Sequence, residues 1–258
     1  AEEMGAAGDL EEEAVAAGLL IQLMAQLCAL YAHNFACRPT LALGESEELK
    51  SRDIEAHDDW QRVLAGYVDA IPVNDLPSPD FRPALVFPGA FHPLHEGHRR
   101  MAALAAERTG DRVAYEISVT NVDKLPLDYF ELHERASQFG RDELVYFTRA
   151  PKFTDKARLF PGATFLVGAD TITRIADPRY YRDAADCRSA IEKLAAHDVR
   201  FLVFGRAVGE HFQTLDDLEL PPRLEALCAS VSAEEFRADI SSTELRAAAA
   251  EESSEALE

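Results

Sequence analysis

The sequence predicts an α/β protein built on a doubly wound parallel sheet. Five short apolar runs carry the prediction, and they read "ALVFPG", "RVAYEISV", "ELVYFTR", "TFLVGAD" and "RFLVFGR". Each run is rich in β-branched and aromatic residues on consecutive positions, as is typical of strands buried on both faces. Segments with helical spacing separate the runs, and this alternation indicates parallel strands with covering helices.

The expected elements follow one another through residues 84 to 206. We expect strands at 84–89, 112–119, 143–149, 164–170 and 200–206, with helices near 98–108, 129–139, 171–175 and 184–196. In sheets of this kind, ligands bind beyond the carboxyl ends of the strands, where loops lead into helices. The turn after the first strand is therefore the first candidate for a site.

The residues before the sheet have a different pattern. Apolar side chains recur at helical spacing over 10–35 and 46–70, which predicts an α-helical N-terminal segment. Four prolines in the thirteen residues 71–83 are typical of a linker, because proline interrupts helices and strands. We therefore expect three parts: helical segment and linker over 1–80, sheet domain over 81–250, and acidic tail over 251–258. The linker predicts that the sheet folds without the residues before it.

Composition limits the partners. The content of 47% apolar and 28% charged residues is typical of a soluble globular protein. A formal net charge of -20 argues against a protein that grips nucleic acid phosphates over a broad surface. The apolar segment 14–32 is long enough to span a membrane, but Gln22 and Gln26 lie four apart on one helical face and favour a buried amphipathic helix. We expect neither a nucleic acid nor a membrane partner.

The chain ends and the cysteines favour a cytoplasmic protein. The sequence opens on acidic residues where a secretory signal would need basic ones. Its four cysteines, Cys28, Cys37, Cys187 and Cys228, show neither zinc-ligand spacing nor a disulfide framework. A reducing compartment fits this pattern best.

The turn "FPGAFHPLHEGHRRM" gathers three of the eight histidines within seven residues. Gly89 and Gly97 would let a ligand approach the backbone closely. His95 and His98 are about one helical turn apart, so they face the same way if the helix starts near Leu94. Two imidazoles beside a helix N-terminus would make a donor-rich, partly positive pocket for a phosphate. A metal site is the alternative, although a third ligand is not evident nearby.

Other charged and polar motifs follow later strands or lie near the C-terminus. "ISSTELR", 240–246, is either an anion site, with Arg246 as a charged fork, or a helix capping box. Asp170 in "FLVGADT" is either a ligand-binding carboxylate or a helix N-cap. Lys124, Arg149, Lys152 and Lys156 follow the second and third strands and would offset phosphate charge, unless they are ordinary surface charges.

At the histidine turn the sequence resembles a known superfamily. Gly89, Phe91, Pro93, His95, Gly97 and His98 reproduce the GxFxPxHxGH signature of the HxGH nucleotidylyltransferases. "ISSTELR" is similar to the ISSTxxR motif of the same superfamily, and "GADT" resembles a segment of the nicotinate and nicotinamide mononucleotide adenylyltransferases. Residues 10–28 are faintly similar to the closing helix of CinA-type amidase domains.

The resemblance implies a Rossmann-like fold and a nucleotidyl transfer reaction. A nucleoside triphosphate, ATP or CTP, would transfer its nucleoside monophosphate to a small phosphorylated acceptor such as nicotinamide or nicotinate mononucleotide, with Mg²⁺ as cofactor and pyrophosphate as product. The alternatives are a cytidylyltransferase acting on a phosphorylated alcohol and a catalytically silent, nucleotide-binding regulatory module. The resemblance leaves room for a homo-oligomer.

The resemblance also implies a set of site residues. The catalytic residues would be His95, His98 and Arg246. The nucleotide would contact Gly89, Ala90, Phe91, Gly97, Arg206, Ser241, Ser242 and Thr243. The acceptor would contact Lys124, Lys152 and Asp170, and no residue is assigned as a metal ligand.

Overall fold

A computed structural model of the chain describes residues 57–74, 81–122, 125–208 and 211–237, together with Ala17 and Leu20. The chain divides into two compact units, Ala1–Asp53 and Ile54–Glu258. In the first unit, Ala17 and Leu20 are helical and exposed. The rest of the predicted helical stretch 10–35 and the predicted acidic tail lie outside the described residues.

The second unit is built on a seven-stranded sheet in the order β1-β4-β3-β2-β5-β6-β9. Six strands are parallel: β2 (Leu85–Pro88), β3 (Val113–Ser118), β4 (Leu144–Thr148), β5 (Thr164–Gly168), β6 (Arg200–Phe204) and β9 (Cys228–Val231). Numbered along the chain, these six have the Rossmann order 3-2-1-4-5-6. The predicted doubly wound parallel sheet is confirmed, and its order reverses between β2 and β5.

Helices connect the strands as predicted, with additions. They are α2 (Asp58–Leu64), α3 (Glu96–Thr109), α4 (Tyr129–Ala136), α5 (Phe153–Leu159), α6 (Ala169–Ala176), α7 (Ala184–Ala196) and α8 (Pro222–Glu225). Two 3₁₀ turns, η1 (Pro178–Tyr180) and η2 (Leu215–Asp217), and a hairpin of β7 (Arg206–Val208) with β8 (His211–Gln213) complete the described part. No helix within the described ranges is both long enough and apolar enough to cross a membrane.

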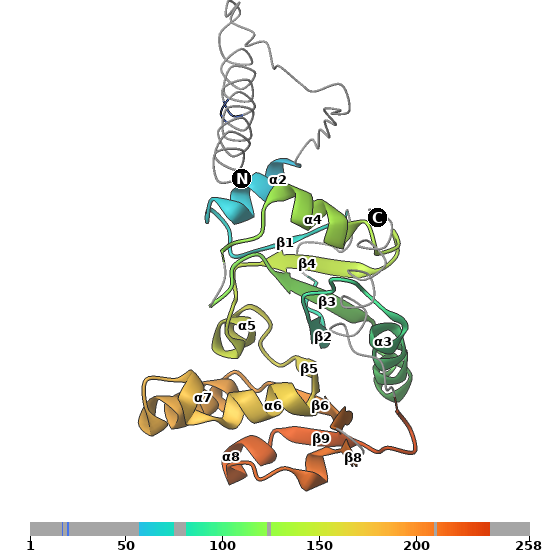
Figure 1. Cartoon of the computed structure of the whole chain (residues 1–258), viewed down its shortest axis with the longest axis vertical. Helices are drawn as coiled ribbons and strands as arrows, with labels where there is room; N and C mark the ends of the chain where they lie inside the picture. The colour runs from blue at the N-terminus through green and yellow to red at the C-terminus, as the bar shows by residue number, and fades with distance from the viewer. Residues whose placement is uncertain are drawn as a thin grey trace, which may run out of the picture. The chain divides into compact units, whose positions relative to one another are not determined.

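Side chains alternate along each strand between two cores, one on each face of the sheet. In β2, Leu85 and Phe87 belong to one buried cluster and Val86 to the other. The first cluster also contains residues of α2, α3 and α4, and the second contains residues of α5, α6, α7 and α8. Burial on both faces explains why the strands read as continuous apolar runs. Figure 1 shows α6 and α7 together beside the strands that they cover.

The linker interpretation of 71–83 is wrong at its start. Residues 70–72 form β1 (Ala70–Pro72), which pairs antiparallel with β4. Proline is tolerated because β1 is an edge strand, where a missing N–H faces outward. Trp60 and Val63 of α2 and Ile71 of β1 are buried in the first cluster. Trp60, Val63 and Ile71 therefore share a core with the sheet, which argues against the expectation that the sheet folds without the residues before it.

Candidate active site

The predicted site residues that the structure describes follow the carboxyl ends of four strands. The histidine turn follows β2, Lys152 follows β4, Asp170 follows β5 and Arg206 follows β6. Because β2 and β5 flank the point where the strand order reverses, His95 and Asp170 both come from strands beside the switch point. Open sheets of this class bind ligands at that point.

Gly89 and Phe91 shape the turn after β2. Phe91 has a φ of 44°, in the left-handed region, and its side chain is only 2% exposed. A Cβ on Gly89 would lie 2.6 Å from the Phe91 ring, so only glycine fits over that ring. The ring packs edge-on against Phe87 and Tyr115 at centroid distances of 5.3 and 5.4 Å. Phe91 therefore supports the site from beneath, while Ala90 beside it is exposed.

His95 and His98 meet at the start of α3. His95 is the N-cap, and its ring stacks on that of His98 with centroids 3.6 Å apart. The backbone N–H of His95 donates to Nδ1 of His98 over 3.3 Å. Gly97 is buried between them in the first turn of the helix, whereas His92 is exposed. The predicted common orientation of His95 and His98 is confirmed.

Burial makes this histidine pair neutral near pH 7. It lowers the pKa of His98 to about 4, with the neighbouring His95 as the second cause, and it also lowers the pKa of His95. Any positive charge of this pocket near pH 7 therefore comes from the N-terminus of α3 and not from the two imidazoles. Because Nδ1 of His98 accepts a hydrogen bond, the single proton of the neutral ring lies on Nε2. His98 is thus a neutral donor at a helix N-terminus.

Asp170 and Arg206 form an ion pair on the other side of the switch point. Nη1 of Arg206 lies 3.2 Å from Oδ2 of Asp170, and both side chains are partly exposed. The N-cap of α6 is Gly168, so the alternative assignment of Asp170 as an N-cap is wrong. A Cβ on Gly168 would lie 2.7 Å from Oδ1 of Asp170, so glycine makes room for the carboxylate. An incoming phosphate would compete with Asp170 for Arg206.

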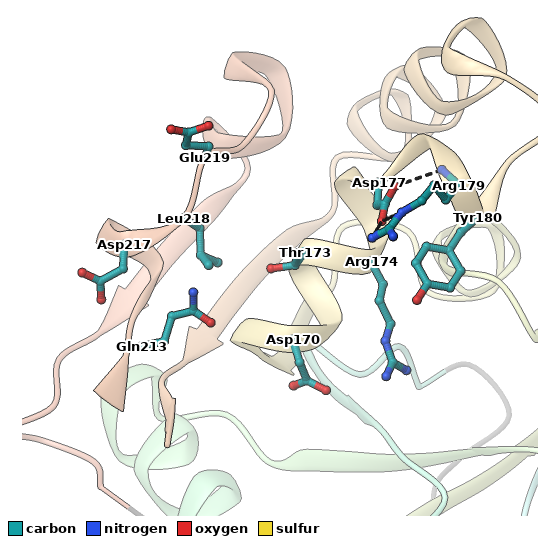
Figure 2. A pocket seen from close by; sticks show the side chains of 10 residues that line it. All are labelled: Asp170, Thr173, Arg174, Asp177, Arg179, Tyr180, Gln213, Asp217, Leu218 and Glu219. Carbon is teal, nitrogen blue, oxygen red and sulfur yellow. Dashed lines mark hydrogen bonds and ion pairs between the residues drawn. The ribbon is translucent and has the colours of Figure 1, made fainter. Parts of the chain in front are cut away.

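Two cavities flank α6. The smaller, of about 500 Å³, lies between Asp170, Arg174 and residues of the β8–η2 region such as Gln213 (Figure 2). The larger, of about 690 Å³, is lined by Lys152, Arg174 and Tyr181 among others. The described lining of these two cavities does not include His95 or His98.

Arg174 is the cation that the sequence interpretation missed. It lines both cavities, is exposed, and projects from α6 in the same direction as Asp170 (Figure 2). The other two arginines of the larger cavity are engaged, Arg179 by Asp177 at 2.6 Å and Arg182 by Asp186 at 3.1 Å. Among the described residues, no ion pair or side-chain hydrogen bond engages Arg174. Its spacing of four from Asp170 was the signal that could have revealed it.

Two of the four predicted cleft cations have structural partners instead. Lys156 is 6% exposed, and its Nζ donates to Glu116 Oε2 and to the Ala150 carbonyl, both at 2.7 Å. Arg149 donates to the carbonyls of Val63 and Leu64 at the end of α2. Lys152 is exposed at the N-cap of α5 and borders the larger cavity. The basic cluster that sequence proximity predicted is therefore wrong for Lys156 and Arg149.

Several predicted residues lie outside the described ranges. They are Lys124, Ser241, Ser242, Thr243 and Arg246. Their assignments as ligands of the acceptor and of the triphosphate stay predictions. Within the described ranges, no group of three or more His, Cys, Asp or Glu side chains is arranged to hold a metal ion.

The fold and the turn define a class of protein. A Rossmann-order sheet with a glycine-supported histidine turn at its switch point is the arrangement of a nucleotide-binding α/β protein. The sequence of residues 86–248 matches the cytidylyltransferase-like family. The chain belongs to this family, which indicates nucleotidyl transfer. The match spans both the histidine turn and the "ISSTELR" segment, and a comparison with curated proteins gave no significant match.

Proposed function

We propose that the protein transfers the nucleoside monophosphate of ATP to a phosphate monoester such as nicotinamide or nicotinate mononucleotide. Family membership supports nucleotidyl transfer, and one observation carries the mechanism. Burial against the Phe91 ring keeps His98 neutral. Its Nδ1 accepts a hydrogen bond from the His95 N–H, so its one donor is Nε2–H. A fixed neutral donor stabilises charge that develops in a transition state.

The reaction in this proposal is a direct in-line displacement. An oxygen of the acceptor phosphate forms a bond to the α-phosphorus while the bond from that phosphorus to the α–β bridging oxygen breaks, and pyrophosphate leaves. His98 Nε2–H donates to an α-phosphate oxygen as charge gathers there, and the N-terminal dipole of α3 adds to the same field. The protein then contributes positioning and charge stabilisation, without a covalent enzyme intermediate.

Mg²⁺ belongs to this proposal as a companion of the triphosphate. The described residues offer no cluster of three metal-ligating side chains. We propose that the ion would be bound through the oxygens of the triphosphate and through water, where it would neutralise phosphate charge. The outgoing pyrophosphate would be held by Ser241, Ser242, Thr243 and Arg246, in keeping with the resemblance of their motif.

The larger cavity is the proposed acceptor site. It borders the segments that follow β3, β4 and β5, and it combines aromatic walls, Tyr180 and Tyr181, with the cations Lys152 and Arg174. A mononucleotide presents one planar ring and one phosphate, which suit an aromatic wall and a guanidinium fork. Asp170 would act on the acceptor side by controlling Arg206, its ion-pair partner.

A cytidylyltransferase is the second candidate, because the matched family is the cytidylyltransferase-like family. In that case CTP would replace ATP and a phosphorylated alcohol would be the acceptor. The histidine turn contacts phosphate in both cases, so its chemistry does not separate the two nucleotides.

The test is a matrix of four nucleoside triphosphates against mononucleotides and phosphorylated alcohols, read by pyrophosphate release. Turnover with ATP and a nicotinate or nicotinamide mononucleotide would support the proposal. Turnover with CTP and a phosphorylated alcohol would establish the second candidate. Nucleotide binding by calorimetry without pyrophosphate release under any pair would reject both in favour of a silent regulatory module.

A further inference from the structure

Side chains of α4 and the residues directly after it satisfy the backbone of the histidine turn. The segment between β2 and α3 has left the sheet, so its polar backbone groups need other partners. Nε of Arg135 donates to the Ala90 carbonyl over 3.1 Å. Nε2 of Gln138 donates to the Phe91 carbonyl over 2.8 Å, and its Oε1 accepts from the Leu94 N–H over 2.7 Å.

The two bonds of the Gln138 side chain require an amide. One end of the group must donate to a carbonyl and the other must accept from an N–H, and a carboxylate offers only acceptors. Gln138 is half-buried, and its own backbone is held too, because Nη2 of Arg99 on α3 donates to its carbonyl over 3.0 Å. Arg99 is itself paired with Glu143 at 2.6 Å. Gln138 thus connects the histidine turn with α3, the helix that follows the turn.

The hydrogen bonds of Gln138 are next to the hydrogen bond of the histidine pair along the chain. The Leu94 N–H, fixed by Gln138, immediately precedes the His95 N–H, which donates to Nδ1 of His98. If the Leu94 N–H changed direction, the neighbouring His95 N–H would shift as well. The hydrogen bond from His95 N–H to Nδ1 of His98, which keeps the ring proton on Nε2, would then be weakened. The strained left-handed Phe91 lies between the two anchored ends, so the turn depends on outside support.

We propose that Gln138 is a positioning residue for the nucleotidyl transfer site, which sets the backbone of the histidine turn and thereby the orientation and tautomer of His98. The inference rests on the proposed function for its kinetic consequence. Its structural part, the link from Gln138 to the His98 ring, stands apart from any activity.

The decisive variant is Gln138→Glu, which keeps the shape of the side chain and removes its donor. Single-turnover kinetics should show the chemical step slowed by roughly 10- to 100-fold, because small displacements of a catalytic group cost rate, while nucleotide affinity changes little. Gln61→Glu is the matched control, since Gln61 is exposed on α2 and undergoes the same chemical change. It should leave both quantities at wild-type values.

A second measurement needs no activity. Nitrogen chemical shifts of the histidine rings should report an Nε2–H tautomer for His98 in the wild type and in Gln61→Glu, and a mixture of tautomers in Gln138→Glu. A silent wild-type enzyme with this shift pattern would reject the proposed function and keep the positioning link. Unchanged His98 shifts together with wild-type rate in Gln138→Glu would overturn the inference.

Gln138→Leu guards against a misfolded variant, because it removes both hydrogen bonds without adding a charge. Its thermal unfolding is measured beside its kinetics. A folded Gln138→Leu protein with a slowed chemical step and altered His98 shifts would support positioning. Loss of folded protein in both variants would show that Gln138 merely stabilises the fold, and the proposal would fail.

Discussion

At the scale of single residues, the proposed mechanism depends on one imidazole, that of His98, whose proton lies on one nitrogen. Burial on Phe91 and contact with His95 keep His98 uncharged, and the His95 N–H occupies its Nδ1. A neutral donor does not attract the ground-state phosphate strongly, yet it stabilises charge that grows later. This distinction separates effects on binding from effects on rate.

His98→Ala should therefore slow the chemical step far more than it weakens ATP binding. Removing one fixed donor of this type reduces kcat by roughly 10² to 10³. His92 is exposed, so His92→Ala should have a mild effect and serves as the control. Single-turnover rates and calorimetric affinities for the three proteins decide the matter. A His98→Ala protein whose only defect is ATP affinity would show a binding residue instead.

The same burial predicts a pH dependence of stability. The pKa of His98 is about 4 in the folded chain and about 6.5 in the unfolded chain. Between these values the unfolded chain binds a proton that the folded chain does not, so the free energy of unfolding should fall as pH falls from about 6.5 to 4. In His98→Gln this part of the loss should disappear. Urea unfolding at several pH values measures it, and equal slopes in both proteins would contradict the assignment.

At the scale of elements, a buried ion pair joins the neighbouring strands β3 and β4 to α5, the helix that follows β4. Lys156 of α5 reaches Glu116 of β3, which also accepts from the Thr148 hydroxyl at the end of β4. Glu116 is fully buried. Because Lys156 also donates to the Ala150 carbonyl, the pair fixes the backbone just before Lys152 and the larger cavity.

Lys156→Met should destabilise the fold by about 3–5 kcal/mol, because it leaves a buried carboxylate without its partner. The double variant Lys156→Met with Glu116→Leu should recover much of that loss, since no charge is left buried. Arg158→Ala is the control on the same helix. Arg158 pairs with Asp69 at the surface, so its loss should change stability by less than about 1 kcal/mol. Chemical denaturation of the three variants would refute the claim if Lys156→Met matched the control.

Sequence predicted the elements whose signals are long and regular. The five central strands were found because burial on both faces makes continuous apolar runs, and the helix at 184–196 was found residue for residue. β1 and β9 were missed because only one residue of each strand is buried, so neither gives a continuous apolar run. Helix α5 was missed because it is a short segment that follows Pro151.

The part of the candidate site that lies within one short stretch of sequence, the histidine turn, could be predicted. Gly89, His95 and His98 are close along the chain, so their spacing gave their geometry. Lys156 was misassigned because its partner Glu116 is forty residues away, and only the fold brings them together. Gln138 carries no local signal that separates it from other polar side chains near helix ends, and the only local signal for Arg174 is its spacing of four from Asp170.

At the scale of the whole molecule, the described residues before the sheet belong to its core. Trp60, Val63 and Ile71 are buried in the same cluster as strand and helix residues of the sheet. The loss in free energy of unfolding from removing three such side chains is comparable to the whole stability of an ordinary domain, about 5–15 kcal/mol. We therefore expect the fold to depend on residues that the prolines of 71–83 led us to assign to a linker.

A chain that begins at Ile54 should accordingly remain folded, and a chain that begins at Ser78 should not. The first keeps α2 and β1, and the second loses both. Cooperative urea unfolding, followed by fluorescence and circular dichroism, distinguishes a packed core from its absence. Full stability in the chain that begins at Ser78 would show that α2 and β1 contribute nothing to the core.

The shortness of β1 bears on self-association. Exposed strand edges are templates on which another chain can add a strand, and proteins guard them with short strands and proline. The sheet ends in β1, three residues that close on Pro72, and in β9, four residues. Neither edge offers a long ladder to a second copy. If the protein forms a homo-oligomer, we therefore expect the copies to meet through side chains on helices and loops. We do not expect strands of one copy to pair with the sheet of another, so growth into fibres should be disfavoured.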